Sequence, residues 1–196
     1  MSDVARLLKS NPFSTHRVRP GLLEYRFEAG QSFDAFFTEL KAANWRGQIV
    51  GPHGSGKSTL LCSLANYWSG FDRKPLRINL NAGQRSLPKI DWSSMNAQSQ
   101  LIVDGYEQLS LFAKSRLVLR TMLSGVGILV TSHGSACWLA KVHETRTSKR
   151  TAIELETDLV TPRAPELISP DVISHCYDAN QGDIRETFMM LFDKVA

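Results

Sequence analysis

Short apolar runs alternate along this chain with stretches in which apolar residues recur every three or four positions. Brief apolar runs rich in β-branched residues predict buried strands. Five such runs stand at Gln48–Val50, Leu76–Leu80, Leu101–Val103, Val126–His133 and Thr151–Glu156. Because strands and helices alternate in this pattern, we expect an α/β fold, with a three-layer parallel sheet of about five strands and helices on both faces.

Three stretches before the tail show the spacing of amphipathic helices. One follows Ser32, a favourable N-cap residue, and places several aromatic side chains on one face. A second runs from Lys57 toward Gly70, where glycine supplies a stop, and a third covers Leu111–Leu123. These helices fit between the predicted strands.

The last part of the chain predicts two short helices. Residues 159–165 contain two prolines and indicate a linker, and Ser169–Pro170 is a typical helix start. Asp183 begins the last helix, with Glu186 at capping-box spacing. We therefore divide the chain into a lead-in with one helix (1–46), an α/β core (47–160) and a helical tail (161–196).

The stretch Gly51–Ser58 separates the first strand from the helix that begins at Lys57. It fits the pattern G-x-x-x-x-G-K-[ST] at every fixed position, in the strand–loop–helix context that the pattern requires. Its glycines let successive backbone N–H groups point into one concavity that suits phosphate oxygens. Lys57 can reach the β- and γ-phosphates. The expected nucleotide-binding residues are Gly51, Pro52, His53, Gly54, Ser55, Gly56, Lys57, Ser58 and Thr59.

Asp104 ends the third apolar run, where a strand can deliver a carboxylate to a metal ion. Ligands of parallel sheets bind at the carboxyl ends of the strands, and Mg²⁺ prefers oxygen ligands. We expect Ser58 and Asp104 to bind the Mg²⁺ that accompanies a nucleoside triphosphate. The chain has no N-K-x-D motif for guanine, so ATP is the default nucleotide.

The composition is ordinary for a globular protein, with 42% hydrophobic and 21% charged residues in 196 positions. No apolar run approaches the roughly 20 residues of a membrane span, so we expect no membrane contact. The first residues, MSDVARLLKSNPF, lack the apolar core of a signal peptide. Cys62, Cys137 and Cys176 stand in no metal-ligand spacing. We therefore expect a cytoplasmic protein with buried, free thiols.

The net charge of +4 comes from basic clusters at residues 6–19 and 141–150. Mild basicity does not by itself identify a nucleic-acid partner. The clusters are compatible with nucleic acid, with a protein partner or second copy of the chain, and with a solvated surface.

The stretches GPHGSGKST and LIVDGYEQL resemble the Walker A and Walker B motifs of the P-loop NTPases. The layout is similar to the branch that includes the AAA+, STAND and ABC ATPases. In that branch a fourth strand inserts beside the phosphate-loop strand and ends in a polar sensor. The resemblance implies that Thr131, Ser132 and His133 lie near the γ-phosphate; the alternative is a hydroxyl or histidine that serves only the turn.

The stretch NQGDIRETFMMLF resembles the lid helix of AAA+ proteins, in which an arginine after Gly-Asp reaches back to the nucleotide. Arg185 takes that place, and its alternative role is a solvated residue of the first helical turn. By the same resemblance, Arg17–Gly21 is expected near the adenine.

One position departs from the family pattern. A glutamate that polarises the attacking water usually follows the Walker B aspartate, but Gly105 stands there and the nearest carboxylate is Glu107. Glu107 can act as the general base if the turn presents it, or it caps the next helix. We expect hydrolysis to be slow, partner-dependent or absent, and the candidate catalytic residues are Glu107, His133 and Ser132.

Two other functions compete with an ATP-dependent switch. A small-molecule or nucleotide kinase is one, because LIVDGY resembles the Asp-Gly-aromatic strand of nucleoside monophosphate kinases and RTSKR resembles an arginine lid. About fifty residues precede the glycine loop, however, and Glu107-Gln108 replaces the usual Pro-Arg. The other is a non-catalytic nucleotide-binding adaptor in a larger assembly, including one on nucleic acid.

Overall fold

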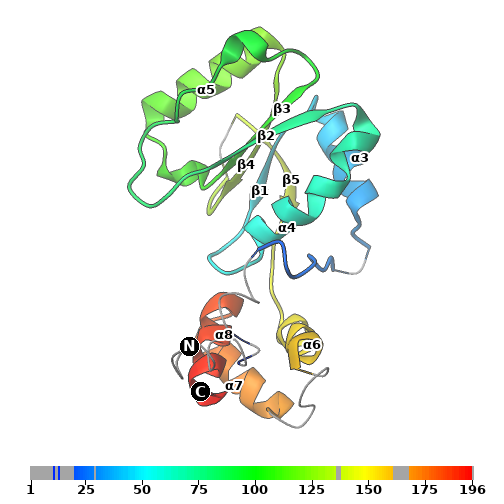
Figure 1. Ribbon diagram of the computed structural model, residues 1–196, viewed down its shortest axis with the longest axis vertical. Helices are drawn as coiled ribbons and strands as arrows, with labels where there is room; N and C mark the ends of the chain where they lie inside the picture. Colours follow the sequence, from blue (N-terminus) through cyan, green and yellow to red (C-terminus); the bar gives the residue numbers. More distant parts are fainter. Residues whose placement is uncertain are drawn as a thin grey trace, which may run out of the picture. The chain divides into compact units, whose positions relative to one another are not determined.

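The computed structural model describes residues 11, 13, 20–28, 30–135, 138–160 and 168–195, and within them five parallel strands form one sheet in the order β2-β3-β4-β1-β5 (Figure 1). The strands are β1 (Arg46–Val50), β2 (Lys74–Asn79), β3 (Ser99–Asp104), β4 (Gly127–Ser132) and β5 (Ala140–Glu144). The expected parallel α/β sheet is confirmed. The fourth strand also lies beside the strand that precedes the glycine loop, as expected.

The chain divides into two compact units. The sheet unit comprises Phe27–Gly51 and Leu64–Thr145. The helical unit comprises Met1–Arg26, Pro52–Ser63 and Arg146–Ala196.

One face of the sheet is covered by α5 (Leu111–Ser124). Ser110 begins this helix, because its Oγ accepts the Ala113 N–H at 3.2 Å. Leu117 of α5 joins a core cluster with alternate residues of the central strands: Leu101, Val103, Ile128 and Val130. The spacing of two is what places these side chains on a single face.

The other face of the sheet receives α3 (Phe33–Ala42). Ser32 caps this helix as predicted, with its Oγ accepting the Ala35 N–H at 3.1 Å. The helix comes close to β1 at Gly47, where a Cβ would lie only 3.0 Å from the Leu40 side chain. Phe37 of α3 stacks on Phe71 with ring centroids 4.3 Å apart.

The fifth strand is not the one that the sequence pattern predicts. It is β5, whereas residues 151–156 lie inside the helix α6 (Lys149–Val160). Ser148 begins α6, since its Oγ accepts the Thr151 N–H at 3.1 Å. Ala152 and Glu156 are both buried and stand one helical turn apart. The β-branched Thr151 suggested a strand, but helical spacing over the longer stretch decides the structure.

The helix that begins at Lys57 is also shorter than predicted. It is α4 (Lys57–Ser63), and the turns that follow are of the 3₁₀ type, at Leu64–Asn66 and Trp68–Phe71. Two further 3₁₀ turns are Trp92–Ser94 and Tyr106–Gln108.

The core of the helical unit forms between α6, α7 (Pro170–Ala179) and α8 (Ile184–Val195). Asp183 caps α8 as predicted, because its Oδ1 accepts the backbone N–H groups of Arg185 at 2.9 Å and Glu186 at 3.1 Å. The reciprocal bond of a capping box is not formed by Glu186. The Asp183 N–H donates to the Asn180 carbonyl at 3.0 Å instead.

The cysteines and the helix lengths bear on two further expectations. Cys176 is a buried free thiol as expected, Cys62 is only partly buried, and Cys137 lies outside the described residues. Among the helices that the structure describes, none is long and apolar enough to span a membrane.

The stability of the sheet unit should depend on His143 of β5. This buried ring makes edge-to-face contacts with Phe27 and Phe36, at centroid distances of 5.4 and 6.1 Å. Burial lowers the pKa of His143, although Glu28 and Glu144 act in the opposite direction. The folded state therefore binds this proton more weakly than the unfolded chain does.

We expect the free energy of unfolding to be highest above the ordinary histidine pKa of 6.5 and to fall as the pH drops through the lowered pKa of His143. Urea unfolding at about pH 7.5 and about pH 5 measures the difference. In His143→Gln this part of the decline should disappear; an unchanged decline would assign the pH dependence to other groups.

Candidate functional site

Asp104, the last residue of β3, is held at the carboxyl edge of the sheet by two neighbours. Thr131 of β4 donates its hydroxyl to Asp104 Oδ1 at 2.6 Å and accepts the Gly105 N–H at 2.9 Å. Arg77 Nη2 donates to Asp104 Oδ2 at 3.0 Å. The Asp104 side chain is only 15% exposed, so its orientation is fixed by these bonds. Each carboxylate oxygen keeps a further lone pair that can bind a cation.

Glu107 and His133 form a second pair at this edge. His133 Nε2 lies 3.0 Å from Glu107 Oε1, and His133 Nδ1 lies 3.3 Å from the Gly51 carbonyl oxygen. The other carboxylate oxygen, Glu107 Oε2, is buried and has no hydrogen-bond partner among the described residues. Two residues that the sequence named separately are thus brought together as a carboxylate and an imidazole, which can orient water or transfer a proton.

Ser132 and Gly105 complete the same edge. The Ser132 hydroxyl donates to the Gly134 carbonyl at 2.6 Å, which holds the turn after β4. Gly105 has a φ of 82°, and a Cβ there would lie 3.0 Å from the Leu80 carbonyl oxygen. The backbone therefore leaves no comfortable place for a side chain directly after Asp104.

The glycine loop of the helical unit folds around the Pro52 carbonyl. Lys57 Nζ donates to this oxygen at 2.6 Å and Ser55 Oγ donates to it at 2.8 Å. Gly54 and Gly56 have φ values of 64° and 87°, in the left-handed region. Of the remaining predicted residues, Ser58 and Thr59 lie half-buried in the first turn of α4.

The same loop lies against two segments, of which the one around Asp183 is the stretch that resembles a lid helix. A Cβ at Gly54 would lie 1.8 Å from Asp183 Oδ1, so the loop contacts the residue that caps α8. A Cβ at Gly56 would lie 3.3 Å from the Tyr25 ring, and the Tyr25 N–H donates to Ser63 Oγ at 3.0 Å. The helix start that carries Arg185 is therefore next to the loop.

Several site predictions stay untested by these contacts. Ser58 belongs to the helical unit and Asp104 to the sheet unit, so their pairing as magnesium ligands remains a prediction. Of Arg17–Gly21, the segment expected near the adenine, residues 17–19 lie outside the described residues, so this expectation also remains a prediction.

Sequence reasoning missed Arg77, Tyr25 and Asp183 as neighbours of the candidate residues. Arg77 carried a signal, because it is the one charged residue in the apolar run Leu76–Leu80. Asp183 belongs to the stretch whose resemblance to a lid helix implied a place for Arg185 near the nucleotide, whereas the contact of Tyr25 with the loop joins positions far apart in the chain and carried no signal.

In the described part of the chain, no group of three or more His, Cys, Asp or Glu side chains could hold a metal ion. A nucleotide-bound Mg²⁺ requires fewer protein ligands, since water and phosphate oxygens supply the others. No family model matches this chain, and no curated protein matches it.

The hydroxyl of Thr131 should stabilise the carboxyl edge of the sheet. Thr131→Val leaves Asp104 Oδ1 and the Gly105 N–H without their shared partner, at a position that is 1% exposed. We expect a loss of about 1–3 kcal/mol in the free energy of unfolding, measured in urea. Thr131→Ser keeps the hydroxyl and is the matched control. If Thr131→Val and Thr131→Ser had the same free energy of unfolding, the two hydrogen bonds would contribute nothing to stability.

Proposed function

We propose that this chain binds Mg–ATP through Gly51–Ser58 and acts as a slow or partner-dependent ATPase of AAA+-like type, that is, a nucleotide-controlled switch. One observation carries the proposal. β1, β4 and β3 are parallel neighbours in that order, and their carboxyl ends lead to Gly51, His133 and Asp104. The start of the glycine loop and the two candidate residues therefore leave the sheet at the same edge. The Gly51 N–H donates to the Ser132 carbonyl at 3.2 Å, which fixes that start beside β4.

The residues present suit a nucleotide. The two positive-φ glycines give the loop the curvature that directs backbone N–H groups inward. Lys57 already bends back over the loop, where its ammonium group can exchange the Pro52 carbonyl for phosphate oxygens. Magnesium, bound with the triphosphate, would neutralise negative charge, with Ser58 and Asp104 as the proposed protein ligands.

The ion pair between Arg77 and Asp104 affects how Asp104 can bind a metal ion in this proposal. The guanidinium neutralises the carboxylate at 3.0 Å, so a cation that binds Asp104 must compete with Arg77 or use the remaining lone pairs.

Arg185 is the proposed sensor of the γ-phosphate. The start of α8, which carries Arg185, lies next to Gly54 of the glycine loop, and this contact supports the proposal.

Hydrolysis needs a group that orients water, and Glu107 is the best-supported candidate. Its Oε2 is without a described partner, while Oε1 is fixed by His133. An acceptor held in one orientation can position a water molecule for attack. The carboxylate is two positions beyond the usual one, and an additional arginine from a partner is proposed for full activity. Slow turnover by the isolated chain follows from both points.

Lys57→Ala should remove most of the affinity for the triphosphate, because the loop loses its only ammonium group. Fluorescence titration with a labelled ATP measures this. In the same titration, Asp104→Asn should abolish the magnesium dependence of ATP binding, because it removes a carboxylate that is a proposed ligand of the metal ion. Lys41→Ala, at an exposed position of α3, is the charge-matched control for Lys57. Undiminished binding by folded Lys57→Ala would refute the proposed nucleotide site.

Turnover by the isolated chain should fall far below the median enzyme value of about 10 per second. Glu107→Gln keeps the shape of the side chain but not its basicity, so the residual hydrolysis should vanish while Mg–ATP binding remains. Chromatography of the nucleotide and phosphate products is the measurement. Fast hydrolysis that Glu107→Gln leaves intact would place the catalytic group elsewhere, and phosphate transfer to an acceptor would identify a kinase.

A further inference from the structure

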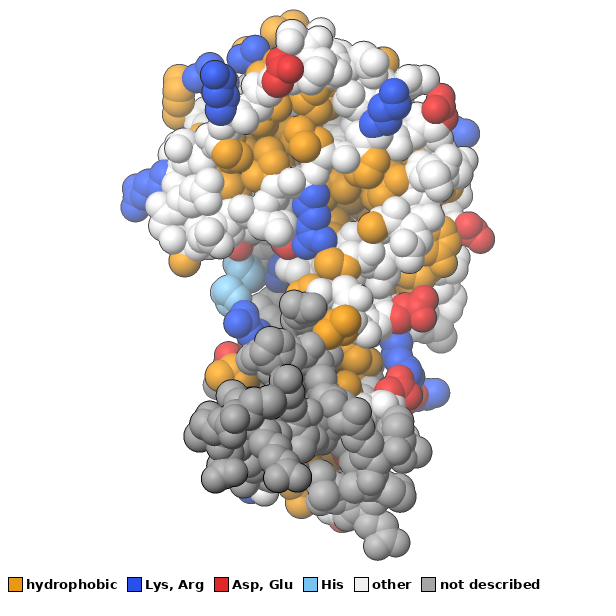
Figure 2. All heavy atoms as spheres, in the orientation of Figure 1, with side chains coloured by type: hydrophobic (Ala, Val, Ile, Leu, Met, Phe, Trp, Pro, Cys, Tyr) orange, Lys and Arg blue, Asp and Glu red, His pale blue; other side chains and the backbone are white. Residues whose placement is uncertain are grey.

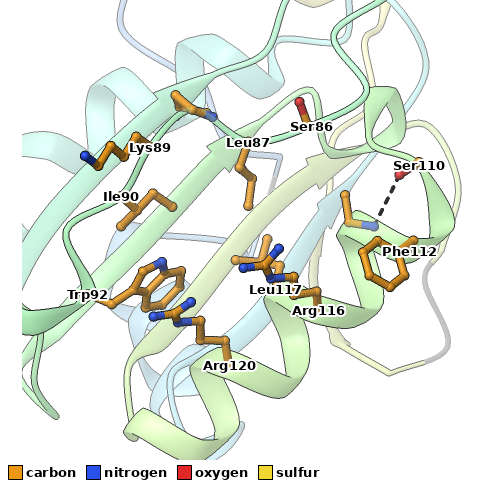
Figure 3. A pocket seen from close by; sticks show the side chains of 12 residues that line it. Ser86, Leu87, Lys89, Ile90, Trp92, Ser110, Phe112, Arg116, Leu117 and Arg120 are labelled. Atoms are coloured by element: carbon orange, nitrogen blue, oxygen red, sulfur yellow. Dashed lines mark hydrogen bonds between the residues drawn. The ribbon is translucent and has the colours of Figure 1, made fainter.

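A groove of about 410 Å³ lies in the sheet unit between α5 and the segment that joins β2 to β3 (Figure 3). Figure 3 shows Leu87, Ile90 and Trp92 on the connecting segment, facing Leu117 and the two arginines of α5. The floor of the groove is apolar. Neither the glycine loop nor Asp104 lines it, so the groove is independent of the proposed nucleotide site.

The charged residues that line this groove all have the same sign. They are Lys89, Arg116 and Arg120, and no carboxylate is among the lining residues. The Arg120 guanidinium lies 4.9 Å from the centroid of the Trp92 ring, a cation–π contact that keeps the charge over the apolar floor. In the described part of the chain, none of these three cations forms an ion pair. The groove itself thus supplies no negative charge opposite these cations, and an acidic ligand would complement it.

The outer face of α5 extends this apolar surface into solvent. Phe112, which lines the groove, is 77% exposed, and Leu123 in the last turn is 81% exposed. Leu119 lies between them on the same line of the helix surface, and Leu111 and Met122 are exposed on the neighbouring line. A solvent-facing side of a helix is normally polar. Figure 2 shows apolar side chains gathered over the upper part of the visible face, with Lys and Arg and some Asp or Glu side chains at the margin. Such a patch marks an interaction surface.

We propose that this groove and the outer face of α5 dock an acidic segment of another protein that carries apolar side chains. Carboxylates of the segment pair with Arg116, Arg120 and Lys89, and its apolar side chains cover Trp92 and Phe112. This occupant is the one that satisfies both the charge and the apolar surface. A twofold contact between copies of α5 would bring like charges together. A nucleic acid would leave the aliphatic residues of α5 uncovered, and a flat bilayer cannot enter a concave site.

The test selects binding peptides from a displayed random library on the full chain, followed by affinity measurements on the selected peptides by fluorescence anisotropy. We expect the selected sequences to be enriched in Asp and Glu together with Leu, Phe or Trp. Arg116→Glu/Arg120→Glu should weaken their binding at least about tenfold, and added salt should weaken binding to the unchanged protein. Binding should also change the tryptophan fluorescence of the unchanged protein, and this change should be lost in Trp92→Phe.

Lys41→Glu, a single charge reversal on α3 against the two of the double arginine variant, should leave the affinity within about twofold and shows how much a change of net charge away from the groove contributes. Leu119→Ser tests the apolar face without altering any residue that lines the groove. It should weaken binding while the circular dichroism spectrum is unchanged, so the test holds even if the double arginine variant does not fold.

Selected peptides without acidic enrichment, or equal binding by the arginine and Leu119 variants, would overturn the proposal. Concentration-dependent self-association that Leu119→Ser abolishes would assign this face to a second copy of the chain. Cosedimentation with phosphatidylserine vesicles, or binding of DNA, that is lost in the arginine variant would likewise replace the proposed occupant.

Discussion

The position of β4 between β1 and β3 is the constraint on which the candidate site depends. All six residues of β4 are buried, and parallel hydrogen-bonded pairing to both neighbours fixes the strand's register. That register puts Thr131 beside Asp104 and Ser132 beside Val50, the residue before the glycine loop. A slip of one residue would turn Thr131 to the opposite face and leave the Asp104 carboxylate without its shortest hydrogen bond.

The carboxyl edge of the sheet is thus a connected polar network built on an apolar base. Thr131 and Arg77 each satisfy one oxygen of Asp104, and His133 links Glu107 to the Gly51 carbonyl. Buried polar groups are stabilising only when their partners are in place. Both oxygens of Asp104 have such partners, whereas Glu107 Oε2 is a buried side-chain oxygen without a hydrogen-bond partner among the described residues.

Much of the sheet was predictable because strand signals are local. Four apolar runs coincide with β1 to β4, and Ser32 and Asp183 cap helices as their residue types suggest. The fifth strand was misplaced because β5 contains only one aliphatic branched residue, Val142, among polar neighbours. Its burial comes from packing beside β1, which no short window of sequence contains. The glycine loop and Asp104 were candidates from motif and spacing, and Arg77 stood out as the one charged residue of its apolar run, whereas the contact of Tyr25 with the loop is visible only in the tertiary structure.

The contact between Gly54 and Asp183 changes how the end of the chain should be regarded. Asp183 both caps α8 and occupies the space in which a side chain at position 54 would stand. The glycine loop and the last two helices therefore belong to one compact unit, although more than a hundred residues separate them in the sequence. A version of this protein shortened before α7 would lose part of the wall of its own loop, so a truncation cannot separate the role of the tail from that of the loop, whereas a point substitution can.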